Sequence, residues 1–274
     1  MAAYGALRLL PGARLRWMTG APDLEWHGDI VTALAGKLPE RMAAPENRLL
    51  DDPREKGIGG DAGFVRLAAA IPHEWLSAYA AQTPDGIQGT GLIAYAGNHK
   101  FVAAARGVMS ALASRDVADK VREALVGPWR YEDNNVAFGW DAAARQDSTV
   151  MPHAPDAKNK PCVLGVNWLA WESLPLWQMV DWQTIGVTRA TKVKTKTWCY
   201  PTCAEWLSWD GLKALVLGVG RISERERRAL GVRLWETAIV GRSEGGEFGT
   251  ARTVSTAEKG AGSREGQVPD SLIV

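Results

Sequence analysis

The chain has 274 residues, with 32 Lys and Arg against 31 Asp and Glu, so its formal net charge is +1. This length allows one large domain or two small ones with a substantial hydrophobic core, and the near-neutral charge excludes a generic polycation. Hydrophobic residues make up 46% of the chain, as in ordinary globular proteins. No signal peptide or long apolar run is evident, so we expect a soluble, cytoplasmic protein.

Tryptophan is unusually frequent, with 13 residues against 4 Phe. Tryptophan rings fill wide cores and interfaces, and their ring nitrogens need hydrogen-bond partners when they are buried. We therefore expect most of these side chains to lie in the core or in subunit contacts rather than to stack on nucleic-acid bases.

The first 90 residues are predicted to begin with short strands and turns. Arg14–Met18 and Leu24–His27 alternate as strands do, and Asp29 is the predicted N-cap of a helix that runs to about Lys37. Turn-forming and charged residues between 51 and 60 indicate a loop. Because its glycines lack the spacing of a phosphate-binding loop, we expect no nucleotide site there.

Helical periodicity is present between 64 and 82, with Pro72 at a predicted first helical position. Residues 92–95 follow as a predicted buried strand. Two further helices are expected at 98–113 and 116–125, and the second is expected to pack on the first.

The turn that begins at Gly97 is a candidate recognition site. Backbone amides at a helix N-terminus attract anions, and Asn98 and Lys100 add side-chain donors, with Arg106 farther along the same segment. The alternative is an Asn cap followed by a solvated lysine. His99 has no carboxylate or nucleophile at useful spacing, so it does not by itself indicate acid–base catalysis.

The middle of the chain is acidic, with 7 acids and 3 cations between residues 132 and 181. Residues 128–131 and 136–141 are predicted to pair as strands. The apolar segment 162–182 is predicted to be helical, with Pro175 ending or kinking the helix. We expect the exposed members of one cluster in this segment to bury against another subunit: Trp168, Trp171 and Trp177.

Residues 188–198 alternate β-branched side chains with cations at the two-residue period of a strand, beginning with Arg189. Lys192, Lys194 and Lys196 would share one face about 7 Å apart, which approximates the phosphate spacing along a nucleic-acid strand. Trp198 follows as a candidate stacking surface. The alternative is an edge strand whose lysines prevent aggregation.

The segment 188–252 holds 12 Lys and Arg against 7 Asp and Glu, which indicates a surface that faces a polyanion. Ser223 is the predicted N-cap of a charged helix. A strand is predicted at 231–240, and its Arg233 is a further candidate for nucleic-acid binding.

Cys162, Cys199 and Cys203 are too few and too unevenly placed for a disulfide framework. Cys199 and Cys203 have the spacing of two metal ligands, but no second Cys or His pair lies nearby, so core thiols are favoured over a zinc site. The sequence also contains no histidine–aspartate nuclease pair, paired-acid cluster or nucleophilic triad. We therefore expect no catalytic residues, no metal and no cofactor.

These elements predict an α+β fold of mixed helices and short antiparallel strands around a Trp-rich core. We expect an N-terminal α+β part at 1–90 and a helical and basic-strand part at 91–254. The tail at 255–274 is rich in Gly, Ser and charge, so it is predicted to be disordered.

Four segments carry a family resemblance: Gly97–Phe101, Trp140–Arg145, Asn167–Trp177, and 197–209, which precedes the basic C-terminal strand. In this order they resemble a CRISPR-associated family found with type I-G (formerly I-U) effector genes. Members of that family are similar to reduced versions of the Cascade large subunit. The resemblance covers about 91–252 and does not extend to the first 90 residues.

The resemblance implies a non-catalytic, nucleic-acid-binding subunit of a Cascade-like complex that helps to recognise target DNA or its flanking motif. The implied partners are crRNA, target DNA and other effector subunits, and no membrane. One alternative is a CRISPR RNA-processing endonuclease, with His99 as acid or base and Lys100 stabilising charge. We rank it second because a glycine-rich RNA-binding loop near the C-terminus is missing. The third hypothesis is a scaffold that binds only proteins, and the high tryptophan content supports it.

Overall fold

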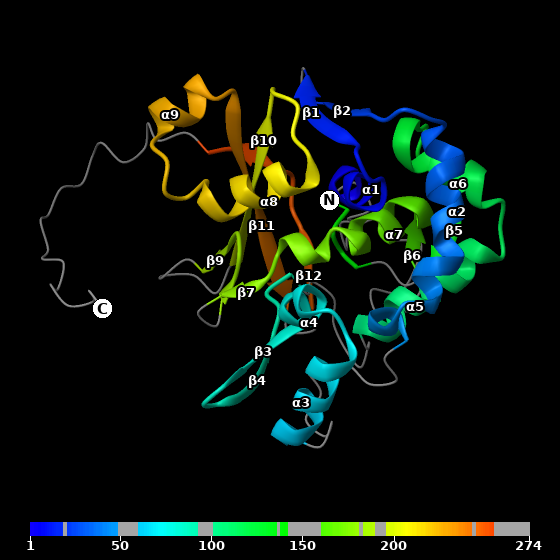
Figure 1. The fold of residues 1–274 in the computed structure, drawn as a ribbon, viewed down its shortest axis with the longest axis horizontal. Helices are drawn as coiled ribbons and strands as arrows, with labels where there is room; N and C mark the ends of the chain where they lie inside the picture. The colour runs from blue at the N-terminus through cyan, green and yellow to red at the C-terminus, as the bar shows by residue number, and fades with distance from the viewer. Residues whose placement is uncertain are drawn as a thin grey trace, which may run out of the picture.

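The computed structural model describes residues 1–18, 21–48, 60–92, 101–135, 138–141, 160–180, 183–189, 196–242 and 245–254. Helices and short antiparallel strand pairs are mixed along these residues, so the fold is α+β as the sequence predicts (Figure 1). No helix in these ranges is long and apolar enough to cross a membrane.

The helical side of the molecule is built around α7 (Leu164–Glu172), whose residues are almost all buried. A helix that is apolar around most of its circumference must be covered on all sides. Three helices cover α7, and a fourth packs outside them (Figure 1). They are α1 (Ala2–Leu9), α5 (Phe101–Ala113), α6 (Val117–Val126) and the outer α2 (Ile30–Ala43).

Two glycines allow the helices to approach α7 closely. A Cβ on Gly5 of α1 would lie 1.7 Å from the carbonyl oxygen of Leu169, and one on Gly165 would lie 2.3 Å from the carbonyl oxygen of Lys120. Neither distance is sterically allowed, so only glycine fits at these two helix crossings.

The predicted N-caps Asp29 and Ser223 are confirmed, whereas the predicted cap Asn98 lies outside the described residues. The Asp29 carboxylate accepts from backbone amides of the first turn of α2. Asp116 also caps α6, where its carboxylate accepts from the backbone amide of Asp119. Ser223 and Glu226 form a capping box at the start of α9 (Glu224–Ala229). The α2 helix runs six residues beyond the predicted Lys37, since buried contacts of its last turn hold it in place.

The predicted helix at 64–82 is divided into two helices and a strand. α3 (Gly60–Ala70) ends before Pro72, and α4 (His73–Tyr79) begins after it, with Pro72 as the N-cap residue in an extended conformation. The chain then forms the hairpin of β3 (Ala80–Thr83) and β4 (Gly86–Gly89).

One antiparallel sheet occupies the other side of the molecule (Figure 1). Its strand order is β12–β11–β10–β9, and β13 pairs with the same strand as β12. Two helices, α8 and α9, lie in the connection between the two long central strands. The bounds are β9 (Val187–Arg189), β10 (Lys196–Cys203), α8 (Trp209–Gly218), β11 (Val232–Arg242), β12 (Gly245–Phe248) and β13 (Arg252–Thr253).

Three small antiparallel strand pairs and two 3-10 turns complete the described elements. The pairs are β1 (Arg14–Met18) with β2 (Ala21–Glu25), β5 (Asp133–Asn135) with β6 (Lys160–Cys162), and β7 (Met179–Val180) with β8 (Gln183–Thr184). The turns are η1 (Pro45–Asn47) and η2 (Leu174–Leu176).

The pairing of 128–131 with 136–141 is wrong. β5 pairs with β6 instead, and Phe138 and Trp140 turn inward, where the Phe138 ring stacks on Trp171 with centroids 5.6 Å apart. Burial of these large rings outweighs the alternation that predicted a strand.

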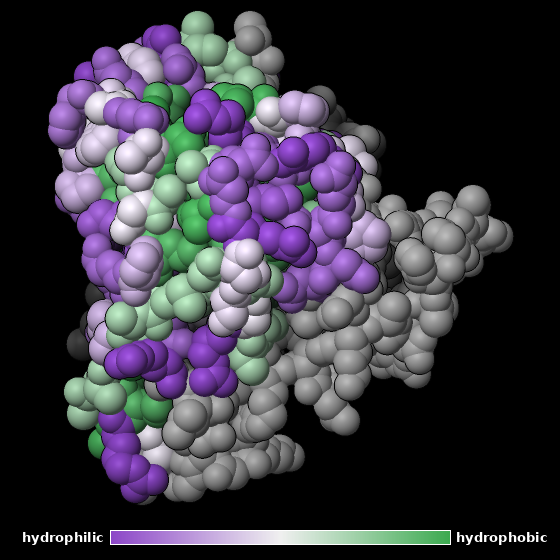
Figure 2. All heavy atoms as spheres, turned by 90° about the vertical axis from the view of Figure 1, so that its right-hand side faces the viewer, coloured by the Kyte–Doolittle hydropathy of each residue, from purple (hydrophilic) through white to green (hydrophobic). Residues whose placement is uncertain are grey.

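The core is rich in tryptophan, as predicted, and one buried cluster runs from Tyr4 to Phe248. Trp168 and Trp177 have no exposed surface, and Trp171 is 1% exposed. The expectation that this cluster binds another subunit is therefore wrong, because the protein's own helices cover the rings. On the side formed by α2, α5 and α6, hydrophilic and hydrophobic residues are mixed (Figure 2).

Several predicted features fall outside the described residues. They are the loop at 51–59, most of the strand at 92–95, and the tail at 255–274. The division of the chain at residue 90 stays a prediction.

Candidate nucleic-acid interface

The predicted basic strand is a hairpin rather than one continuous strand. β9 ends at Arg189 and β10 begins at Lys196, and the two strands are antiparallel with these residues opposite each other. The chain direction therefore reverses between Arg189 and Lys196. The predicted single strand with a row of lysines on one face is wrong for this reason. Lys192 and Lys194 belong to the connecting residues 190–195, which lie outside the described residues.

Two cationic residues thus occupy opposite register positions in the terminal strand pair of the sheet. Side chains of directly opposite residues are close neighbours, and like charges placed there repel each other. The Lys196 side chain is exposed, and in the part of the chain that the structure describes it has no ion-pair partner.

Trp198 is not a stacking surface for bases. Its side chain is 4% exposed, and its ring centroid lies 5.0 Å from that of Trp177, 4.6 Å from that of Tyr200 and 5.2 Å from that of Phe248. Trp198 lies on the same face of β10 as Lys196, but this face is exposed at Lys196 and already buried at Trp198. The prediction of a stacking role is wrong because the ring fills the core.

Arg233 is exposed on β11, opposite Thr202 of β10. Lys196 pairs with Ile239 in the same register, so six residues of strand separate Arg233 from the level of Lys196. At about 3.3 Å per residue this is about 20 Å. The structure therefore does not bring Arg233 together with the hairpin cations.

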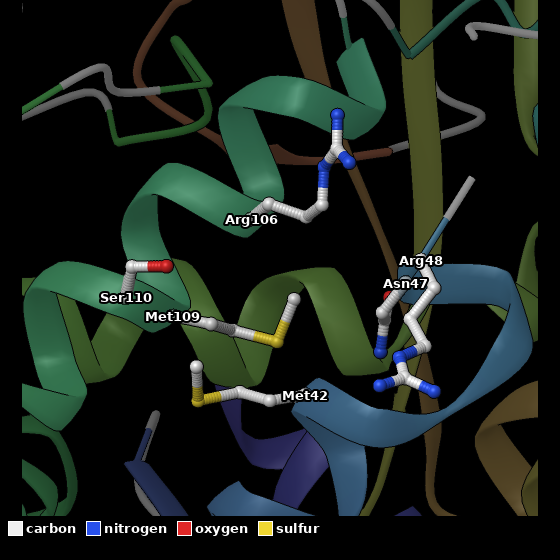
Figure 3. Close-up of a pocket in the computed structure, with 6 residues that line it drawn as sticks. All are labelled: Met42, Asn47, Arg48, Arg106, Met109 and Ser110. Carbon is white, nitrogen blue, oxygen red and sulfur yellow. The ribbon is translucent and has the colours of Figure 1, made fainter. Parts of the chain in front are cut away.

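Arg106 lies on α5 and lines a pocket of about 270 Å³. The pocket opens between α5 and the end of α2 with η1, and Figure 3 shows its side chains. Among the described residues that line it, none is Asp or Glu: Met42, Asn47, Arg48, Arg106, Met109 and Ser110. The two candidates from the predicted turn itself, Asn98 and Lys100, fall in 93–100, outside the described residues.

Asn47 forms a rigid wall of this pocket. Its side-chain oxygen accepts a hydrogen bond from Trp171 Nε1 at 2.8 Å, and its Nδ2 donates to the carbonyl oxygen of Arg41 at 2.9 Å. Both ends of the amide are therefore engaged, and Asn47 is 1% exposed. A side chain held in this way gives the pocket a fixed shape.

Next to Asn47, in the interior, two arginines and two glutamates form a buried ionic network. Glu172 Oε2 accepts from Arg8 Nη1 at 2.6 Å and from Arg41 Nε at 3.0 Å, and Arg41 also pairs with Glu46. Burial raises the pKa of Glu172, while the two guanidinium groups act in the opposite direction. The network places two carboxyl groups beside two guanidinium groups, so the charged partners face each other rather than the pocket.

Sequence reasoning missed both the pocket and the network. A signal for the network was present, because Glu172 is the one acid in the apolar segment 164–172, and such acids are buried only with a partner. Its partners are far away in sequence, at positions 8 and 41, so the pairing itself could not be predicted. The pocket depends on helix packing and left no local pattern.

The cysteines are thiols, as expected. Burial raises the pKa of Cys199 to about 11, so its thiol stays protonated at neutral pH. Within the described ranges no group of three or more His, Cys, Asp or Glu is placed to hold a metal ion.

No protein-family model and no curated protein matches the chain. Two regions bring cationic residues together. One is the hairpin end, where Arg189 pairs with Lys196, and the other is the pocket lined by Arg48 and Arg106.

Proposed function

We propose that this chain is a non-catalytic nucleic-acid-binding subunit of a type I CRISPR effector complex. In this role it contributes to recognition of target DNA or its flanking motif and to assembly with crRNA. The family resemblance of 91–252 motivates the biological setting, and the cationic hairpin end supports the binding role.

The observation that carries the proposal is the opposition of Arg189 and Lys196 across the terminal strand pair. The segment that joins them adds Lys192 and Lys194, so four cationic residues lie within eight consecutive positions, and no acid interrupts them. Such a density of like charge disfavours the hairpin in isolation. A bound row of phosphates removes the repulsion and releases counterions, which is the main source of non-specific nucleic-acid affinity.

The chemistry of this surface favours phosphate contacts over base contacts. Lysine is a flexible point charge that suits phosphate, and Trp198, the aromatic side chain closest to the hairpin end in sequence, is buried. Phosphate contacts position a strand but do not read its sequence. We therefore infer that the hairpin holds the nucleic-acid backbone, and that sequence is read by base pairing with crRNA or by other residues.

The proposal is tested by incubating the purified chain with single-stranded repeat RNA, target DNA duplex and a non-target duplex. We expect salt-sensitive binding without cleavage, and retention of the chain in an RNA-containing complex when it is co-expressed with its neighbouring effector genes. Specific cleavage of the repeat RNA would contradict the non-catalytic role and favour the endonuclease. Absence of any nucleic-acid binding, with retention in the complex, would favour a protein-only scaffold.

A further inference from the structure

We propose that the pocket between α2, η1 and α5 binds one nucleotide, with its phosphate on Arg48 and Arg106 and its base against Met42 and Met109. The pocket volume is about 270 Å³, just below the roughly 300–1,000 Å³ of pockets for drug-sized ligands. It therefore suits one nucleotide, free or as part of a strand. This assignment rests on the proposed function, because the bound nucleic acid supplies the nucleotide.

The charge of the described pocket lining favours an anion. Two guanidinium groups line the pocket, and no carboxylate does among the residues that the structure describes. Glu46, which precedes Asn47 in η1, is buried and paired with Arg41, so its charge is already compensated. Within the described residues neither Arg48 nor Arg106 has an ion-pair partner. Guanidinium groups bind phosphate oxygens through paired, charge-assisted hydrogen bonds, so a phosphate group is the matching anion.

The apolar part of the lining selects a ring. The side chains of Met42 and Met109 lie next to each other between α2 and α5 (Figure 3). Met109 is 2% exposed, so packing holds its side chain in place at the pocket lining, and the exposed Ser110 on the same helix adds a hydroxyl. Thioethers make favourable contacts with aromatic rings, and every base has an aromatic face.

The two charged side chains come from elements that are held together independently of a ligand. α5 packs on α7, on α2 and on η1, and the hydrogen bonds of Asn47 fix the residue before Arg48. A ligand therefore has to order only the side chains of Arg48 and Arg106. This pre-organisation lowers the entropy lost on binding.

The test is isothermal titration of the full chain with adenosine 5′-monophosphate, adenosine and inorganic phosphate as separate probes. We expect the monophosphate to bind and the other two to bind more weakly, because each lacks one of the two contacts. The variant R48Q/R106Q is expected to lose at least about tenfold in affinity for the monophosphate. The control R66Q/R225Q removes the same charge from exposed arginines on α3 and α9 and should bind as the wild type does.

Two outcomes overturn the assignment. One is equal binding of inorganic phosphate and the monophosphate, which would leave a simple anion site without a base contact. The other is equal monophosphate binding by R48Q/R106Q and R66Q/R225Q. Circular dichroism of each variant checks that it is folded, and Met109→Leu, which keeps the side-chain volume, should retain binding of phosphate but weaken the contact with the base.

An oligonucleotide arm separates this inference from the proposed function. A single-stranded RNA with 4-thiouridine is cross-linked to the wild-type chain by light, and the linked peptides are identified by mass spectrometry. We expect a cross-link in the peptides that contain Met42 or Met109. If the RNA does not bind at all, the proposed function fails. If it binds and cross-links only elsewhere, the pocket assignment alone fails.

Discussion

Arg41 Nε donates a hydrogen bond to Glu172 Oε2 over 3.0 Å and so joins the last turn of α2 to the end of α7. Arg8 Nη1 lies 2.6 Å from the same oxygen, and Glu172 has no exposed surface. Three elements of the helical side therefore meet at one carboxylate. Its removal would leave two guanidinium groups in the interior, and among the described residues only Arg41 would keep an ion pair, with Glu46.

Glu172→Ala should lower the free energy of unfolding by about 3–5 kcal/mol, because breaking a buried ion pair leaves an uncompensated charge. Urea denaturation followed by circular dichroism measures this. Glu205→Ala, which removes an exposed acid outside the network, should change the stability by less than about 0.5 kcal/mol. Equal effects of the two substitutions would show that the network does not stabilise the fold.

Gly165→Ala should destabilise the protein by about 1–3 kcal/mol or more, because the new methyl group would overlap the carbonyl oxygen of Lys120. Gly36 provides a matched control in α2. A Cβ there meets nothing within 4 Å, so Gly36→Ala should raise the stability by about 0.5–1 kcal/mol. Thermal melting of both variants gives the comparison, and a stabilising Gly165→Ala would contradict the close contact of α6 and α7.

The thiols of Cys162 and Cys199 should react slowly in the folded protein. Burial raises the pKa of each from 9.0 to about 11, which lowers the thiolate fraction at pH 8 by about 100-fold. In the unfolded chain these thiols ionise first as the pH rises, so folding stability should fall between pH 9 and 11. A thiol-specific colorimetric reagent measures the rates, and rapid labelling of all cysteines without denaturant would contradict their burial.

Trp198→Ala should lower the free energy of unfolding by about 3–5 kcal/mol, because it leaves a cavity beside Trp177 and Phe248. Trp198→Phe keeps an aromatic ring in the core and should leave nucleic-acid affinity unchanged. Trp129 is 44% exposed, so Trp129→Ala serves as the control, with a change below about 0.5 kcal/mol. Loss of nucleic-acid binding in a folded Trp198→Phe protein would restore the stacking role.

The elements that local signals specify could be predicted from the sequence. Asp29, Asp116 and Ser223 are good N-cap residues ahead of helical periodicity, and all three accept from the first turn of a helix. The α+β class and the strand at 232–242 follow in the same way from period and composition. These features depend on residues within one or two turns of each other.

The features that depend on distant residues could not be predicted. Lys196 continues the alternation of 188–198, yet the pairing of Arg189 with Lys196 divides that segment, because β10 binds β9 on one side and β11 on the other. From the sequence Trp198 is expected to be exposed, because its ring contacts are with Trp177 and Phe248, which are distant in sequence. The pocket of Arg48 and Arg106 likewise arises only when α5 packs on η1.

The central claim is that the hairpin cations hold nucleic-acid phosphates, and the salt dependence of binding tests it most directly. Fluorescence anisotropy measures the binding of a labelled single-stranded RNA to the wild type and to the hairpin variant K192Q/K194Q/K196Q. The control variant is R66Q/R122Q/R225Q, which removes three exposed arginines on three helices. The hairpin variant should flatten the slope of log affinity against log salt by about 0.7 per lost phosphate contact. The control should keep the wild-type slope. Equal slopes for the wild type and the hairpin variant would contradict the claim.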